Sequence, residues 1–116
     1  MLPNRVALSQ NATSKLQTIK SNTGLTPNIL SRIAIMLTLK ESNDLSSAGV
    51  VDYDGQKLDK SVLFGEYTDV YDVMINQYIN DNELTQPIGK VISALVEIGV
   101  HKMGHIKQLS DVCKLK

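Results

Sequence analysis

Two stretches near the start of the chain decide its fold: NRVALS at residues 4–9 and LTPNILSRIAIMLTLK at residues 25–40. In the first stretch, Val6 and Leu8 alternate with polar or small residues. This period of two predicts a short strand with one buried face. A short strand alone leaves its backbone groups unpaired. Since no second strand is evident nearby in the sequence, we expect this strand to pair with the same strand of another subunit.

A helix is predicted directly after the strand. Ser9 is a suitable N-cap for this helix, and Gly24 is a suitable C-terminal stop. Three apolar residues fall at i, i+4 and i+7 and form one stripe: Ala12, Leu16 and Ile19. The stripe predicts that one face of the helix packs against the core.

The second stretch predicts another helix, which begins with Thr26 as N-cap and Pro27 as first residue and runs to about Lys40. It is apolar around most of its circumference, and its polar residues form a narrow stripe: Asn28, Ser31, Arg32 and Thr38. Such a helix is buried on nearly all sides, which in a small chain favours an oligomer interface. The order of strand, helix, glycine turn and capped helix is that of a ribbon-helix-helix unit, in which two subunits pair their strands.

The remainder of the chain predicts a loop and more helices. Residues 41–61 are polar and rich in turn residues. Two further helices are predicted within residues 62–116, and the second of them begins at Pro87. The apolar stripe of the first consists of Leu63, Tyr67, Val70, Tyr71, Met74 and Tyr78. We therefore expect one mainly α domain over residues 1–116, with a ribbon-helix-helix-like unit at residues 1–40, assembled into an oligomer.

The charges of the chain are separated along the sequence. The 12 basic and 12 acidic residues give a net charge of 0. Residues 1–40, the basic head, carry five bases and no acid, a charge of +5. Residues 41–86, the acidic middle, carry two bases and ten acids, a charge of −8, and residues 87–116 carry +3. The neutral total therefore does not argue against nucleic-acid binding by the basic head.

A nucleic acid bound to the basic head would be contacted at its phosphates. All five aromatic residues lie in the acidic middle, so stacking on bases is not available to the head. The free N–H groups at the start of the second helix, around Thr26 and Asn28, suit a phosphate. Few outward side chains on the strand can read bases, so we expect salt-sensitive binding with little sequence preference.

Several other classes of protein are excluded by the sequence. It contains no GxSxG, P-loop or dinucleotide fingerprint, so we expect no enzyme, no catalytic residue and no cofactor. His101 and His105 have the i, i+4 spacing of a metal chelate, but a third ligand is not evident and no metal site is expected. The single cysteine, Cys113, permits no internal disulfide and fits a reducing compartment. With no apolar run that spans a bilayer and no signal-peptide pattern, we expect a cytoplasmic protein without membrane contact.

Several blocks of the sequence resemble the DNA sulfur modification protein DndE family. They are LPNRVALS at residues 2–9, TGLTPNILSR at residues 23–32 and LFGEY at residues 63–67, with a closing helix around Gly99. The resemblance implies a role in the bacterial machinery that replaces a non-bridging oxygen of the DNA backbone with sulfur. The other subunits of that machinery are a desulfurase, an ATP-pyrophosphatase-like sulfur-transfer protein and an ATPase. The family members are small accessory proteins, regarded as DNA-binding with nicked duplex as a favoured ligand, and as oligomers, with a tetramer expected.

These observations together predict a non-catalytic subunit that binds double-stranded DNA through its backbone. The expected DNA-contacting residues are Arg5, Lys15, Lys20, Thr26, Asn28, Arg32 and Lys40. Arg32 lies on the otherwise apolar second helix and has an alternative role at an interface. Two other functions remain open: a sequence-specific ribbon-helix-helix repressor, and an assembly subunit without DNA affinity that recruits the other subunits through its acidic face.

Overall fold

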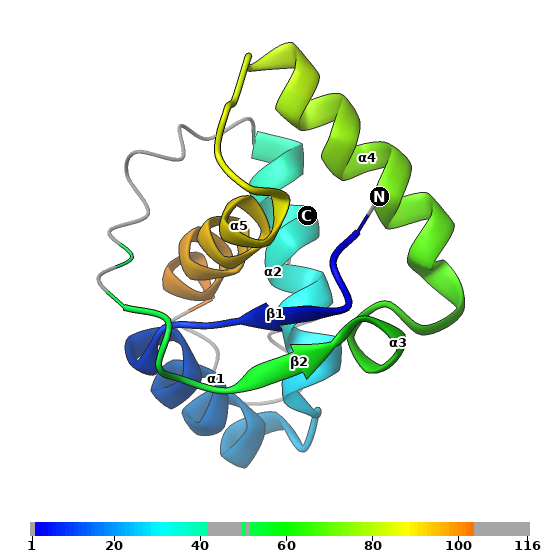
Figure 1. Ribbon diagram of the computed structural model, residues 1–116. Helices are drawn as coiled ribbons and strands as arrows, with labels where there is room; N and C mark the ends of the chain where they lie inside the picture. The colour runs from blue at the N-terminus through cyan, green and yellow to red at the C-terminus, as the bar shows by residue number, and fades with distance from the viewer. Residues whose placement is uncertain (1, 42–49, 51, 104–116) are drawn as a thin grey trace.

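The computed structural model describes residues 2–41, 50 and 52–103 of the 116-residue chain (Figure 1). Its elements are, in chain order, β1 (Arg5–Ala7), α1 (Gln10–Thr23), α2 (Pro27–Glu41), β2 (Lys57–Asp59), α3 (Lys60–Leu63), the 3-10 turn η2 (Gly65–Tyr67), α4 (Thr68–Asp81) and α5 (Ile88–Lys102). The fold is mainly helical with one short two-stranded sheet, which confirms the predicted class. Within the described ranges, no helix has the length and hydropathy of a membrane span.

The partner of strand β1 differs from the one that the sequence predicted. β1 pairs with β2 of the same chain in antiparallel register, with Val6 opposite Leu58. The pairing continues past the strands, where the N–H of Leu8 donates to the carbonyl of Gln56 at 3.0 Å. The expectation that β1 finds no partner strand within its own chain is therefore wrong. β2 has three residues and one apolar side chain within a polar stretch, which is too short to produce a recognisable period.

The caps that the sequence predicted for α1 and α2 are present. The Ser9 hydroxyl accepts a hydrogen bond from the N–H of Ala12 at 3.0 Å, and Gly24 ends α1 with a left-handed φ of 79°. The Thr26 hydroxyl accepts a longer hydrogen bond, 3.5 Å, from the N–H of Ile29. These interactions span three or four residues, which is why sequence alone could locate them.

Helix α5 lies at the centre of the molecule and α2 packs along it (Figure 1). Every residue from Val91 to Val100 of α5 is buried. The two helices approach closely because Gly99 has no side chain: a Cβ there would lie 2.2 Å from the carbonyl oxygen of Ala34. Thr38 of α2 is fully buried at this contact, and its hydroxyl donates to the carbonyl of Leu95 at 2.8 Å.

The narrow polar stripe predicted for α2 is only partly on the surface. Ser31 and Thr38 are buried, whereas Asn28 and Arg32 are half-buried. The burial of Thr38 has a physical reason: its hydroxyl bonds to the carbonyl of Ala34 in its own helix and can then be buried at little cost. The Ser31 hydroxyl is buried without a hydrogen-bond partner among the described residues.

Helix α4 buries only part of its predicted apolar stripe. Tyr71 and Tyr78 of that stripe are in the core, as is Ile75, which the prediction did not include. The rings of Phe64 and Tyr71 lie 4.9 Å apart between centroids. Tyr67 and Val70, predicted to be buried, are exposed. The apolar side of α4 is therefore wider than the part that the core covers.

Candidate functional site

Two of the predicted DNA-contacting cations interact with other side chains of the same chain. Arg5 on β1 donates from Nε to Oδ1 of Asp59 on β2 at 2.9 Å, and both side chains are exposed. The Lys15 ammonium on α1 contacts Nδ1 of His101 on α5. An exposed ion pair contributes little free energy, so Arg5 can exchange Asp59 for another anion.

The other three cations lie on α1 and α2. Lys20 is in the last turn of α1 and Lys40 is in the last turn of α2, and both are exposed. Within residues 2–41, 50 and 52–103, neither lysine has an ion-pair partner. Arg32 is half-buried near the middle of α2, with its guanidinium carbon 5.7 Å from the centre of the Tyr67 ring. The guanidinium of Arg32 therefore makes a cation–π interaction with Tyr67 and is not fully surrounded by solvent.

Thr26 and Asn28 lie together at the start of α2. Thr26 is exposed, and its hydroxyl is used by the N–H of Ile29. The Oδ1 atom of Asn28 is buried and has no hydrogen-bond partner among the described residues. Lys40 lies at the other end of this helix, about 20 Å away at 1.5 Å per residue. One copy of the chain thus does not gather all seven predicted residues at one place.

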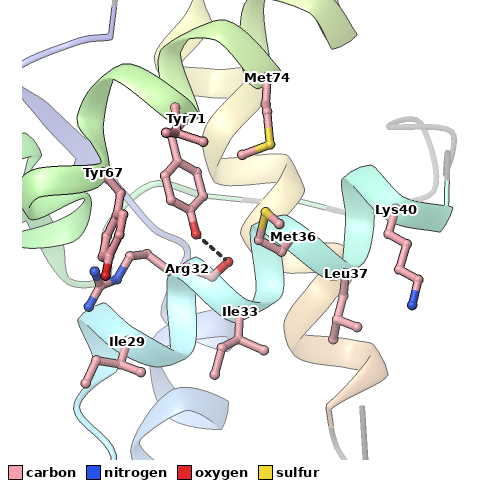
Figure 2. A pocket seen from close by; sticks show the side chains of 10 residues that line it. Ile29, Arg32, Ile33, Met36, Leu37, Lys40, Tyr67, Tyr71 and Met74 are labelled. Carbon is pink, nitrogen blue, oxygen red and sulfur yellow. Dashed lines mark hydrogen bonds between the residues drawn. The ribbon is translucent and has the colours of Figure 1, made fainter. Parts of the chain in front are cut away.

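An apolar groove runs between α2 and α4 (Figure 2). Its main hollow has a volume of about 810 Å³ and is lined by Ile29, Arg32, Ile33, Met36, Leu37, Lys40, Tyr67, Val70, Tyr71 and Met74. A second hollow of about 600 Å³ shares Met36, Lys40 and Met74 with the first, so the two form one groove along both helices. Met36 is 44% exposed and Val70 is 54% exposed, so a large apolar surface remains in solvent here.

The floor of the α2–α4 groove is closed by Tyr71. Its hydroxyl donates to the carbonyl oxygen of Arg32 at 3.5 Å, as Figure 2 shows. Burial raises the pKa of the Tyr71 phenol above its ordinary value of 10.0, and the positive charge of Arg32 partly opposes this shift. The phenol is therefore neutral at physiological pH, and the charged residues that line the main hollow are Arg32 and Lys40.

Comparison with known proteins identifies the family of this chain. The sequence matches the model of the family described as DNA sulphur modification protein DndE over residues 5–111. The chain belongs to the DndE family. No curated protein matches it at a significant level.

Solved DndE structures have the same fold. One is the crystal structure of DndE from Escherichia coli B7A, involved in DNA phosphorothioation modification. It is 30% identical, has a TM-score of 0.72, and the match covers 89% of this chain and 99% of that chain. A glycine-to-lysine mutant of DndE involved in DNA phosphorothioation is 28% identical, with the same TM-score of 0.72 and the same coverage. These findings confirm the resemblance to the DndE family.

This DndE-family chain also contains a buried polar cluster that the sequence analysis missed. Glu97 on α5 is 1% exposed, and its Oε1 accepts a hydrogen bond from the Ser9 hydroxyl at 2.5 Å. His101 Nε2 lies 3.2 Å from the other carboxylate oxygen, and Lys15 contacts the far side of the imidazole. The only signal in the sequence was a single acid in the apolar run of α5, four residues before a histidine.

The buried cluster joins the start of α1 to α5. Ser9 is buried, donates to Glu97 and accepts from the Ala12 N–H, so its one hydroxyl proton is already used. Among the described residues, no group of three histidine, cysteine, aspartate or glutamate side chains could hold a metal ion. The second histidine of the predicted pair, His105, and Cys113 lie outside the described residues.

Proposed function

We propose that this DndE-family chain is a non-catalytic accessory subunit of the bacterial DNA phosphorothioation machinery, acts in the cytoplasm as a single domain of residues 1–116, and binds duplex DNA, including nicked duplex, through its phosphates. The main support is the basic head, which carries five bases and no acid. Lys20 and Lys40 of this head are exposed. The solved DndE of Escherichia coli B7A is involved in DNA phosphorothioation modification, which is consistent with DNA as the ligand.

Contact with phosphates is favoured over reading of bases. In a ribbon-helix-helix repressor, the strands of two subunits pair and their outward side chains enter the major groove. Here β1 pairs with β2 of its own chain, and the exposed Asp59 on β2 holds the Arg5 side chain. An aspartate on the ribbon would face the phosphates of the DNA, which opposes its entry into the groove.

A homo-oligomer, with a tetramer as the state implied by the family resemblance, would strengthen such binding. One copy has its exposed head cations, Lys20 and Lys40, at the ends of two different helices. Several copies multiply the number of phosphate contacts, and affinity rises steeply with that number. The other subunits of the machinery are the expected protein partners.

Fluorescence anisotropy with a labelled duplex, intact or nicked, across a salt series tests this proposal. We expect the affinity to fall steeply with salt, and Lys20→Glu and Lys40→Glu each to reduce the slope of log K against log salt by about 1. Lys90→Glu, which changes an exposed lysine outside the basic head, is the matched control. A flat salt response, or equal effects of all three substitutions, would contradict the proposal, and binding to other subunits without DNA affinity would favour the assembly role.

A further inference from the structure

The α2–α4 groove has the form of a binding site for a helix. Its two walls are the helices α2 and α4, and the hollow between them is lined almost entirely by aliphatic, methionine and tyrosine side chains. Amphipathic helices bind in apolar grooves of this kind, with anchors at i, i+3 or i+4, and i+7. We propose that the groove receives an amphipathic helix of a partner protein, whose apolar ridge is flanked by aspartate or glutamate.

The side chains of the groove suit an inserted helix. Figure 2 shows Met36 on α2 and Met74 on α4 turned toward each other across the groove. Methionine is flexible and polarisable, so a pair of methionines can adjust to the side chains that enter between them. Val70 and Val73 of α4 are 54% and 70% exposed, which leaves apolar area for the partner to cover.

The charges of the main hollow select an acidic partner. Its lining contains Arg32 and Lys40 and no acid, and the acid of the groove, Asp81, lines the second hollow. Both cations are on the α2 wall, eight residues apart, which corresponds to about 12 Å along the helix axis. A docked helix with acidic residues at i and i+7 or i+8 would place one carboxylate near each cation. Such pairs fix the direction in which the helix binds.

A partner protein fits the groove better than a second copy of the chain. Within the described residues, the apolar faces of α1 and α5 are buried in the core of the molecule. α4 leaves Val70 and Val73 exposed, but these residues form the edge of the groove itself. The free apolar surface of the described helices in a second copy is therefore that of the same groove, and pairing two such grooves would bring together two sets of the cations Arg32 and Lys40.

Binding of a synthetic helix tests the proposal directly. The probe is a fluorescein-labelled peptide of about 14 residues, the length of the groove walls, with leucine at the anchor positions and glutamate on the flanks. We expect Val70→Asp to weaken its binding at least about tenfold, because the substitution places a charge in the apolar contact. Val62→Asp is the matched control. Val62 on α3 is 52% exposed, almost the same fraction as Val70, and it does not line the groove. A peptide with lysine in place of glutamate should bind about tenfold more weakly than the acidic peptide.

Methionine methyl NMR locates the bound peptide. Met36 and Met74 line the groove, whereas Met103 is fully buried in the core. We expect the peptide to shift the methyl signals of Met36 and Met74 and to leave that of Met103 unchanged. Absence of binding, equal weakening by both valine substitutions, or a shift confined to other methyl groups would overturn the proposal.

Two further outcomes separate this proposal from the others. If the Met36 and Met74 signals shift with protein concentration alone, a second copy occupies the groove and the partner helix is wrong. DNA affinity should be the same in Val70→Asp and the unsubstituted chain. Lys20→Glu should weaken DNA binding and leave peptide binding unchanged, whereas Lys40→Glu should weaken both, because Lys40 belongs to the basic head and also lines the groove. Failure of peptide binding with salt-sensitive DNA binding intact would overturn this proposal and leave the proposed function standing.

Discussion

The two sides of helix α2 differ in how completely the rest of the protein covers them. On one side it packs on α5, where Gly99 allows the backbones to meet and Thr38 bonds to the carbonyl of Leu95. On the other side it forms a wall of the α2–α4 groove, where Met36 is 44% exposed. The apolar residues around α2 therefore have two roles. Those on one side stabilise the fold, and those on the other side remain available for binding.

The largest expected effect comes from two neighbouring residues of α2 that lie on these two sides. Ile35 is fully buried and Met36 is exposed. We expect Ile35→Ala to lower the free energy of unfolding by about 4 kcal/mol, because it leaves a cavity in a packed core, and Met36→Ala to lower it by less than about 1 kcal/mol. Urea denaturation followed by circular dichroism measures both. Similar losses for the two variants would show that the groove side is as closed as the core.

The close approach of α2 and α5 is tested by two glycines of α5. A Cβ at Gly99 would meet backbone atoms of Ala34 at 2.2 to 2.5 Å, whereas at Gly89 the nearest atom is Cγ of Pro3 at 3.8 Å. We expect Gly99→Ala to destabilise the fold by about 3 kcal/mol, since the helices must separate. Gly89→Ala should be neutral or stabilising by up to about 1 kcal/mol, because alanine favours the helix. Equal stability of the two variants would contradict the close contact between α2 and α5.

The caps of α1 and α2 form a smaller contrast of the same kind. Ser9 caps α1 and also donates to the buried Glu97, whereas Thr26 caps α2 at an exposed position with a longer bond. Ser9→Ala should cost about 2 kcal/mol, because it removes the cap and leaves a buried carboxylate oxygen without its donor. Thr26→Ala should cost about 0.5 kcal/mol. Thermal unfolding of the two variants at the same pH measures both losses of stability. A larger loss for Thr26→Ala than for Ser9→Ala would contradict the prediction.

The smallest effect concerns the buried phenol at the floor of the groove. Because burial raises the pKa of Tyr71, the unfolded chain loses this proton at a lower pH than the folded protein. Its contribution to stability is therefore complete below the ordinary pKa of 10.0 and is lost as pH rises from there toward the folded pKa. Tyr71→Phe should lose less stability between about pH 8 and pH 11 than the unsubstituted chain. Urea titrations of the two proteins at several pH values in this range measure the difference, and equal losses of stability would contradict the prediction.

The parts of the candidate site that sequence analysis found are those with local causes. The Ser9 and Gly24 caps and the cations of the basic head follow from residues close together in the chain, and the structure places Lys20 and Lys40 on the surface. The Ser9–Glu97 contact was missed because 88 residues separate its two members. The groove was missed because Tyr67 and Val70 fit a buried stripe as well as an exposed wall, and periodicity alone does not distinguish the two.

The sequence by itself determined where α1 and α2 begin and end and how charge is divided along the chain. Capping and helical periodicity act over a few residues, so they can be read without a partner. Only the tertiary structure decided that β1 pairs with β2 of its own chain, that Glu97 is buried beside Ser9, and that α2 has one closed and one open side. Each of these depends on contacts between residues far apart in the chain, and their formation depends on how the whole molecule packs.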